Sequence, residues 1–199
     1  MRKPSQILAP MALIALMGGS LTGCVETIVG GAATVGLAAA QERSVGDAVD
    51  DSLIGVQINS LLLDENIDLF AQVSSEVHEG RVLLTGAVDT AEFRVKAARL
   101  VWSIEGVQEV INEIEVNPDF TLLDSAKDTW ITTKIRARLL TDPDVVDINY
   151  TIETVNGVVY LLGIAQSDAE LKRTTWQIQQ VSGVVRIVSH VVLKNDPRR

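Results

Sequence analysis

The residues with the most distinctive chemistry lie between Asp128 and Leu140, in the segment DTWITTKIRARLL. The segment has no Gly or Pro and Asp128 suits an N-cap, so the segment is predicted to be a helix. At about 100° per residue, Ile131, Ile135 and Leu139 form one apolar stripe that should face a core. The opposite face and the borders between the two faces carry Trp130, Thr133, Lys134, Arg136, Ala137, Arg138 and Leu140.

A helix that only packs onto a sheet requires one apolar face. A second apolar face that holds a tryptophan and is bordered by cations is typical of a helix lying at a membrane surface. The segment therefore predicts a lipid-contact surface made by the seven residues from Trp130 to Leu140 named above. The alternative is that Trp130 covers another part of the same protein, because most apolar helix residues are buried somewhere.

Cys24 is the only cysteine and ends a predicted targeting segment. Arg2 and Lys3 form a basic start, and the apolar run from Ile7 to Met17 is too short to span a bilayer. The next residues, Leu-Thr-Gly-Cys24, resemble a bacterial lipobox, which implies cleavage before Cys24 and lipidation of its sulfur and amino group. The alternative is an ordinary signal peptide with a stray cysteine.

Two regions follow from this interpretation. Residues 1–23 are a lipoprotein signal peptide, and residues 24–46 are a lipidated Gly/Ala-rich tether with weak order. By resemblance to lipoprotein sorting rules, Val25 after the cysteine favours the outer membrane over retention in the inner membrane. Loss of Arg2 and Lys3 changes the formal charge from −9 to −11.

The sequence contains no recognisable catalytic or metal-binding pattern. It lacks H-x-x-x-H, G-x-S-x-G and a phosphate loop. The run Asp142, Asp144, Asp147 lacks the Gly and the distal Glu of a calcium loop, and we expect it to be a solvated turn. The acidic net charge of −9 argues against nucleic-acid binding. We therefore expect no enzyme, no cofactor and no metal.

The chain beyond the tether is an internal repeat with a constant offset of 77 residues. Ile54, Ile58 and Leu62 recur as Ile131, Ile135 and Leu139, and Gly80-x-Val-x-Leu-x-Gly86 recurs from Gly157 to Gly163. No gap is needed over about seventy residues, a register that chance does not keep. The sequence therefore predicts two copies of one small domain, at residues 47–118 and 125–195.

Each copy has the predicted order α-β-β-α-β. In the second copy we expect a helix at 126–141, strands at 149–153 and 158–162, a helix from Ser167 to about Val181, and a strand at 184–193. Asn156-Gly157 predicts the hairpin between the first two strands, and Gly86 and Gly163 are expected where the second strand of each copy ends. The fold class is therefore α+β, with a three-stranded mixed sheet and two helices on one face in each domain. Each unit is small, so we expect the two to dock on each other.

The pattern G-x-V-x-L-x-G, followed after about twenty residues by Gly106-Val107 or Gly183-Val184, resembles the BON domain of periplasmic and outer-membrane proteins. The lipobox, the RSVG motif at 43–46 and DTWITTK at 128–134 resemble the dual-BON outer-membrane lipoproteins in particular. This resemblance implies a non-enzymatic lipoprotein on the periplasmic face of the bacterial outer membrane that supports membrane integrity. It further implies that the first helix of the second domain binds anionic phospholipid of the phosphatidylglycerol or cardiolipin type and directs the protein to division sites. The membrane-contacting Trp and helix-end Leu of that family match Trp130 and Leu140, whereas Arg138 replaces an expected neutral polar residue.

Charge distinguishes the two copies. Residues 47–116 contain fourteen Asp/Glu and four Lys/Arg, whereas residues 125–193 contain seven of each. The positions that match Lys134, Arg136 and Arg138 are Gln57, Asn59 and Leu61, so we expect the first helix not to bind an anionic membrane. The acidic first domain is explained by plain solubility or by a basic protein partner. A lipid-binding integrity module is thus one function class, and a scaffold docking on the outer-membrane assembly machinery is the alternative.

Overall fold

The computed structural model describes residues 41–197. The predicted signal peptide, Cys24 and most of the predicted tether therefore lie outside the described residues. The end of that tether is ordered, contrary to our expectation. The Glu42 backbone amide donates to Asn149 Oδ1 at 3.0 Å, the Lys194 ammonium lies 3.1 Å from Glu42 Oε1, and the first helix already begins at Val45.

Two similar units follow one another along the chain. The first contains α2 (Val45–Glu65), α3 (Ile67–Gln72), β1 (Val73–His78), β2 (Arg81–Val88), α4 (Ala91–Trp102), β3 (Glu109–Asn112) and β4 (Glu115–Val116). The second contains α5 (Leu122–Leu140), the short 3₁₀ helix η1 (Asp147–Asn149), β5 (Tyr150–Val155), β6 (Val158–Ala165), α6 (Asp168–Gln179) and β7 (Arg186–Leu193). The predicted α+β class and the repeated αββαβ order are confirmed, with α3 as an additional short helix in the first copy.

The second strand of each copy is the central strand of a mixed sheet. β2 pairs antiparallel with β1 and parallel with β3, and β6 pairs in the same way with β5 and β7. β4 keeps the register of β3 against β2, so it continues the same edge after an interruption at Glu113 and Ile114. Each hairpin turns through two residues with positive φ, as Asn156 (51°) and Gly157 (73°) do in the second copy.

Two glycines lie elsewhere than we predicted. Gly86 and Gly163 lie inside β2 and β6 rather than at their ends. Gly163 has φ +133°, and a Cβ there would lie 2.0 Å from the Asn149 carbonyl oxygen. Gly86 meets Gln72 in the same way, at 2.1 Å. Glycine is therefore required because another backbone segment passes directly over the strand.

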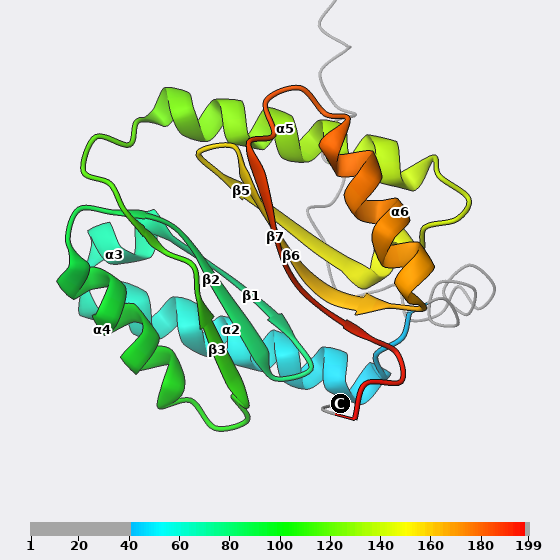
Figure 1. Ribbon diagram of the computed structural model, residues 1–199. Coiled ribbons are helices and arrows are strands. Elements are labelled where there is room, and N and C mark those ends of the chain that lie inside the picture. Colours follow the sequence, from blue (N-terminus) through cyan, green and yellow to red (C-terminus); the bar gives the residue numbers. More distant parts are fainter. Residues whose placement is uncertain (1–40, 198–199) are drawn as a thin grey trace, which may run out of the picture.

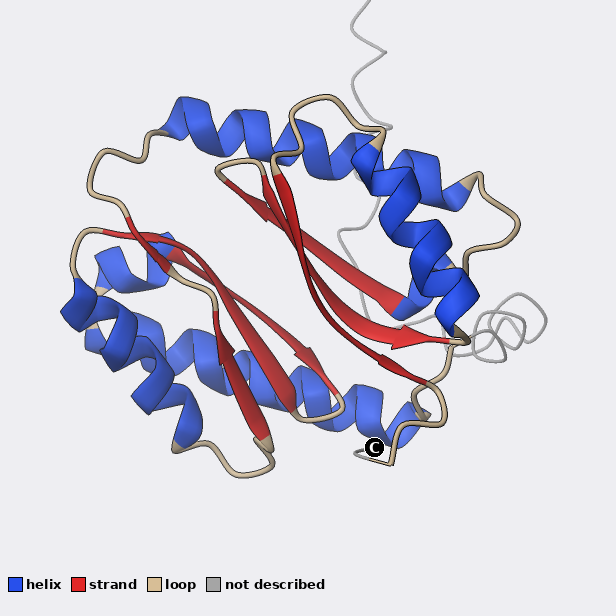
Figure 2. Cartoon of the chain, viewed as in Figure 1, coloured by secondary structure: helices blue, strands red, loops and turns tan. Residues whose placement is uncertain are grey.

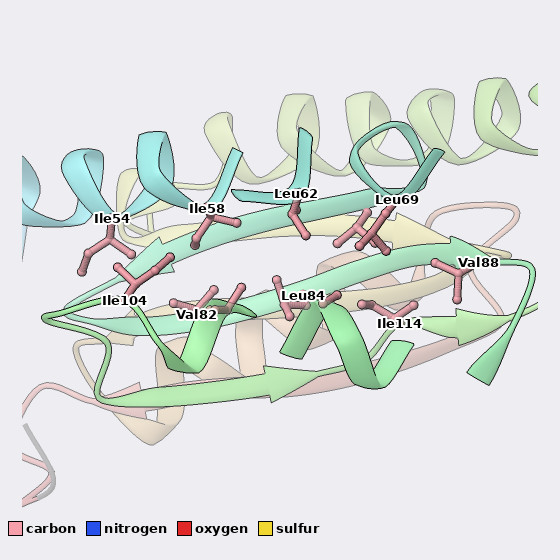
Figure 3. Packing of buried hydrophobic residues seen from close by; sticks show 12 residues of the cluster. Ile54, Ile58, Leu62, Leu69, Val82, Leu84, Val88, Ile104 and Ile114 are labelled. Carbon is pink, nitrogen blue, oxygen red and sulfur yellow. The ribbon is translucent and has the colours of Figure 1, made fainter. Parts of the chain in front are cut away.

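Each domain has a core between its sheet and its helices (Figure 3). Ile54, Ile58 and Leu62 project from one face of α2 toward Val82 and Leu84 on β2. The second core repeats this pattern with the predicted stripe Ile131, Ile135 and Leu139, all of which are buried. Side chains at alternate positions of the central strands point the other way, as expected for a strand buried on both faces.

The two sheets face each other and the helices lie outside, giving four layers (Figures 1 and 2). A third apolar cluster fills the space between the sheets and draws on both domains: Leu83, Ile111, Val155, Val158, Tyr160 and Leu162, with Phe120 and Val188 at its edge. His190 Nε2 on β7 also lies 2.9 Å from Glu113 Oε1 in the first domain. The expected docking of the two domains is therefore confirmed. In this arrangement α5 and α6 face one side of the molecule, and α2, α3 and α4 face the other (Figure 1).

Candidate functional site

Helix α5 begins about one turn earlier than the sequence interpretation placed it. The Thr121 hydroxyl accepts from the Asp124 backbone amide, and the Asp124 carboxylate accepts from the Thr121 amide in return. This reciprocal pair is a capping box, and the T-x-x-D pattern in the sequence was the signal for it. Our placement of Asp128 at the N-cap is wrong, because Asp128 lies within the second turn of the helix.

Asp128 instead fastens the helix to the hairpin of its own domain. Its buried carboxylate accepts from the backbone amides of Asn156 and Gly157 at 2.8 and 2.9 Å. Asp51 holds the turn at Glu79 and Gly80 in the same way, with both distances 2.9 Å. A carboxylate with two backbone donors fixes both the position and the rotation of its helix. That rotation determines which face of α5 points outward.

The outward face carries the apolar residues that we predicted. Trp130 is 60% exposed and Leu140 is 75% exposed, and Thr133 and Ala137 between them are also exposed. Within residues 41–197, Trp130 is therefore not buried under another part of the protein, which was the alternative interpretation. Ile131, Ile135 and Leu139 point the opposite way, into the core.

The added first turn extends this face with two residues that the sequence interpretation missed. Leu122 is 91% exposed and Leu123 is also well exposed. Their helical angles place them on the side of Trp130 and Leu140. With 19 residues, α5 is roughly 28 Å long, so its outer face presents apolar side chains at both ends and near the middle.

The three predicted cations do not gather at one place. The Lys134 ammonium lies 5.0 Å from the centre of the Trp130 ring, in a cation–π contact. Arg136 donates to the carbonyl of Ile152 on β5 at 3.3 Å, and Arg138 donates to Gln177 on α6. Only Lys134 therefore stands beside the tryptophan, while the two arginines are held along the flanks of the helix.

Comparison with known protein families identifies the repeated unit. Residues 50–118 and residues 127–195 each match the BON domain. The chain belongs to the BON-domain family. Both copies of the BON domain open with a helix held by an aspartate to the hairpin, and the candidate site lies on that helix in the second copy.

Three relatives show how far this similarity extends. An uncharacterised protein from Anaplasma centrale is 43% identical over 76% of this chain and 99% of its own length. The outer membrane lipoprotein DolP of Haemophilus influenzae is 31% identical over 91% of this chain and 95% of its own. A 21 kDa hemolysin of Actinobacillus pleuropneumoniae is 30% identical over 75% of this chain and 78% of its own. The similarity to DolP thus covers much more than the two BON domains.

The second BON domain carries another tryptophan–cation pair, which the sequence interpretation did not include. Trp176 on α6 is about half exposed, and the Arg173 guanidinium lies 5.1 Å from its ring centre. Arg173 also binds Asp142 just beyond the C-terminal end of α5. The pair therefore lies next to the Leu140 end of the candidate face, on the same outer layer (Figure 1). The i,i+3 spacing of Arg173 and Trp176 was the available signal.

The Asp-rich turn after α5 differs from our expectation. Asp142 is buried rather than solvated, and Gln177 and Arg173 both donate to its carboxylate. These hydrogen bonds, that of Gln177 first, lower the pKa of Asp142 against the opposing effect of burial. Its role is to join α5 to α6. Among residues 41–197, no group of three His, Cys, Asp or Glu side chains converges as a metal site would require. Within the same range, no helix has the length and apolar character needed to cross a bilayer.

Proposed function

We propose that this protein is a lipoprotein of the bacterial outer membrane, anchored on the periplasmic side, that binds anionic phospholipid through α5 and supports outer-membrane integrity. The observation that carries this proposal is the exposed apolar face of α5, with Trp130 at its centre and Lys134 against the ring. Similarity to the outer membrane lipoprotein DolP over 91% of this chain supports the location. Enrichment at division sites is the further expectation that the family resemblance implies.

The physical chemistry of this face suits the interface of a bilayer. A leucine moved fully out of water contributes about 2 kcal/mol, and α5 offers Leu122, Leu123 and Leu140. Tryptophan prefers the interface because its ring is apolar and its N–H reaches water or headgroups. Lys134 adds about 1 kcal/mol near an anionic surface. No single one of these contributions suffices, but together they hold a helix in the plane of the membrane.

The distribution of charge over the fold supports a membrane contact through α5. Residues 125–193 of the second domain have seven acidic and seven basic residues, whereas the strongly acidic first domain lies on the side of the molecule away from α5. A molecule docked through α5 therefore keeps most of its negative charge away from an anionic bilayer. At physiological salt, dissolved ions screen the remaining repulsion over a Debye length of about 8 Å.

The decisive experiment is co-sedimentation with vesicles of the unlipidated chain from Val25 onward. We expect binding to vesicles that contain phosphatidylglycerol, weaker binding to pure phosphatidylcholine, and a loss of binding as salt increases. Trp130→Glu should abolish binding with a nearly unchanged melting temperature, because the side chain faces solvent and a charge there resists insertion. Trp102→Glu on α4 is the matched control, since Trp102 is 54% exposed but lies in the first domain.

Two outcomes of this experiment would overturn the proposal. If Trp130→Glu unfolds the domain as severely as the core substitution Ile135→Glu, then Trp130 is a packing residue. If Trp130→Glu folds and still sediments with the vesicles, the lipid-binding surface lies elsewhere. Leu53→Glu should leave binding unchanged, because α2 lacks the cations.

The membrane anchor is tested separately, because Cys24 lies outside the described residues. We expect mass spectrometry of the mature protein to find Cys24 as a lipidated N-terminus. Val25→Asp should move the protein from the outer toward the inner membrane. An unmodified Cys24 in the mature chain would refute the anchoring.

A further inference from the structure

Helix α2 also has an exposed apolar stripe, on the side of the molecule opposite α5. Val49, Leu53, Val56 and Leu63 are all exposed and, with Ser60, follow a four-three-four-three spacing. Val45, which is 73% exposed, lies in line with them at the start of the helix. The buried residues Ile54, Ile58 and Leu62 occupy the opposite face. This spacing is the pattern by which one helix packs along another.

The membrane that we propose for α5 cannot also cover this stripe. The two helices belong to the opposite outer layers of the four-layer arrangement, with both sheets between them (Figures 1 and 2). A flat bilayer that contacts one outer layer leaves the other in solution. Helix α2 moreover contains five Asp or Glu and no Lys or Arg, so an anionic surface repels it.

The charge around the stripe is concentrated along one border. Asp50, Gln57 and Asp64 are exposed on the same side of α2. That border opens into a groove of about 970 Å³ between α2, the β1–β2 hairpin and the segment that precedes β3. The lining includes Leu53 from the stripe and six acidic residues, among them Asp50, Glu79, Glu105 and Glu109, whereas Arg81 is its one basic residue within 41–197. The stripe and the acidic groove therefore form a single continuous surface.

We propose that this surface docks an amphipathic helix of another protein, with an apolar seam that packs on the stripe and a Lys/Arg border that enters the groove. A helix-in-groove contact of this kind uses anchors at the same four-three spacing that α2 presents. The cationic border would lie opposite a groove whose carboxylates outnumber its arginine, Arg81, which pairs with Glu109 at 2.6 Å. Charge complementarity therefore selects the partner and its orientation. A second copy of this chain that docks symmetrically through α2 lacks that complementarity, because α2 would then face an identical helix with five carboxylates and no cation.

The proposal can be tested with a defined peptide. The probe is a helical peptide of leucine and lysine, about 18 residues long, with leucines at four-three spacing so that five turns present one seam. Its control replaces every lysine with glutamate. The ¹⁵N-labelled unlipidated chain from Val25 onward is titrated with each peptide and followed by NMR. We expect the lysine peptide to shift amide signals of α2 and the groove, with an affinity that decreases as salt increases, and the glutamate peptide to shift none.

Two variants separate the apolar contribution from the charged one. Leu53→Gln with Val56→Gln removes the centre of the stripe without adding charge, and should weaken binding about tenfold or more, the effect of losing two partly buried apolar anchors. Asp50→Asn with Asp64→Asn should weaken binding less and reduce its salt dependence. Trp130→Gln on α5 is the matched control and should bind the peptide like the wild type. All three variants change exposed side chains, so their melting temperatures should match that of the parent chain.

Several results would contradict the proposal. Equal binding of the two peptides would show that charge does not select the partner. Unchanged binding by the Leu53/Val56 variant would show that the stripe does not contact the peptide. Dimerisation of the parent chain that this variant abolishes would identify a second copy as the occupant. Loss of vesicle binding in this variant would identify lipid as the occupant. If vesicle binding is lost in the Trp130 variant and kept in the Leu53/Val56 variant, the function proposed for α5 stands whether or not the peptide binds α2.

Discussion

Glu153 is expected to make the protein less stable as pH rises. It lies on β5, paired across the hairpin with Tyr160, and its carboxyl is largely buried. Burial, and after it the negative charge of Glu76, raise the pKa of Glu153 from 4.5 to about 7 against the opposing charge of Arg136. A carboxyl whose pKa is higher in the folded state favours folding when it is protonated. The contribution is thus fully present below about pH 4.5 and is lost as pH rises toward 7.

The magnitude follows from the size of the pKa change. Each pKa unit corresponds to about 1.4 kcal/mol, so the increase from 4.5 to about 7 costs at most roughly 3.5 kcal/mol above pH 7. Partial solvent contact of the carboxyl reduces this value, and about 1–3 kcal/mol is the expected range. Glu153→Gln removes the ionisation and keeps the shape of the side chain. The variant should therefore be more stable than the wild type by that amount at pH 8, and nearly equal to it at pH 4.5.

Urea unfolding of both proteins at pH 4.5 and pH 8 measures this difference. Only the difference between variant and wild type is used, because other groups titrate over the same range. Glu92→Gln on α4 is the control, since Glu92 is exposed and the substitution should have no comparable effect. Glu76→Gln should reduce the pH dependence in part, because the charge of Glu76 is one cause of the raised pKa. A stability gain from Glu153→Gln that is equal at both pH values, or larger at pH 4.5, would refute the reasoning.

Three further predictions concern stability. Asp128→Ala leaves the backbone amides of Asn156 and Gly157 without their acceptor, and should cost about 2–4 kcal/mol in urea unfolding; a loss under about 1 kcal/mol would show that water replaces the carboxylate. Gly163→Ala should prevent the second domain from folding, measured as lost amide dispersion in NMR, because its Cβ would overlap the Asn149 carbonyl. Gly55→Ala is the contrasting change, since nothing lies within 4 Å of a Cβ there. It should raise stability by about 0.5–1 kcal/mol through helix propensity, and a lower melting temperature would contradict this.

The repeat was the most informative feature of the sequence. A constant offset of 77 residues, with Asn156-Gly157 and Glu79-Gly80 at equivalent turns, was enough to predict two α+β units. Local periodicity also separated Ile131, Ile135 and Leu139 from Trp130 and Leu140, because a helix that packs on one sheet has one buried side. These features were predictable because they depend on residues close together in the chain.

The missed features depend on contacts between distant segments. Asp128 looks like an N-cap by residue type, but its acceptor role became visible only once the hairpin at Asn156 was placed beside the helix. Gly163 looks like a strand end, whereas the reason for the glycine is the backbone of Asn149. The stripe on α2 was not predicted, because the first helix lacks the cations that distinguish α5 in the sequence. Exposure on the assembled fold, not residue type, distinguishes Leu53 and Val56 from core residues.

The contact between His190 and Glu113 has a consequence for the history of this fold. The two residues are 77 positions apart and so occupy the same site in the two copies, as do Leu83 and Tyr160 in the cluster between the sheets. Residues that contact their own equivalents in the other copy lie near a two-fold axis. In a dimer of identical one-domain chains, such a residue would have to contact the same residue of the partner chain. Joining the copies removes that restriction. One half can then carry a glutamate where the other carries a histidine, and one outer helix can become cationic while the other stays acidic.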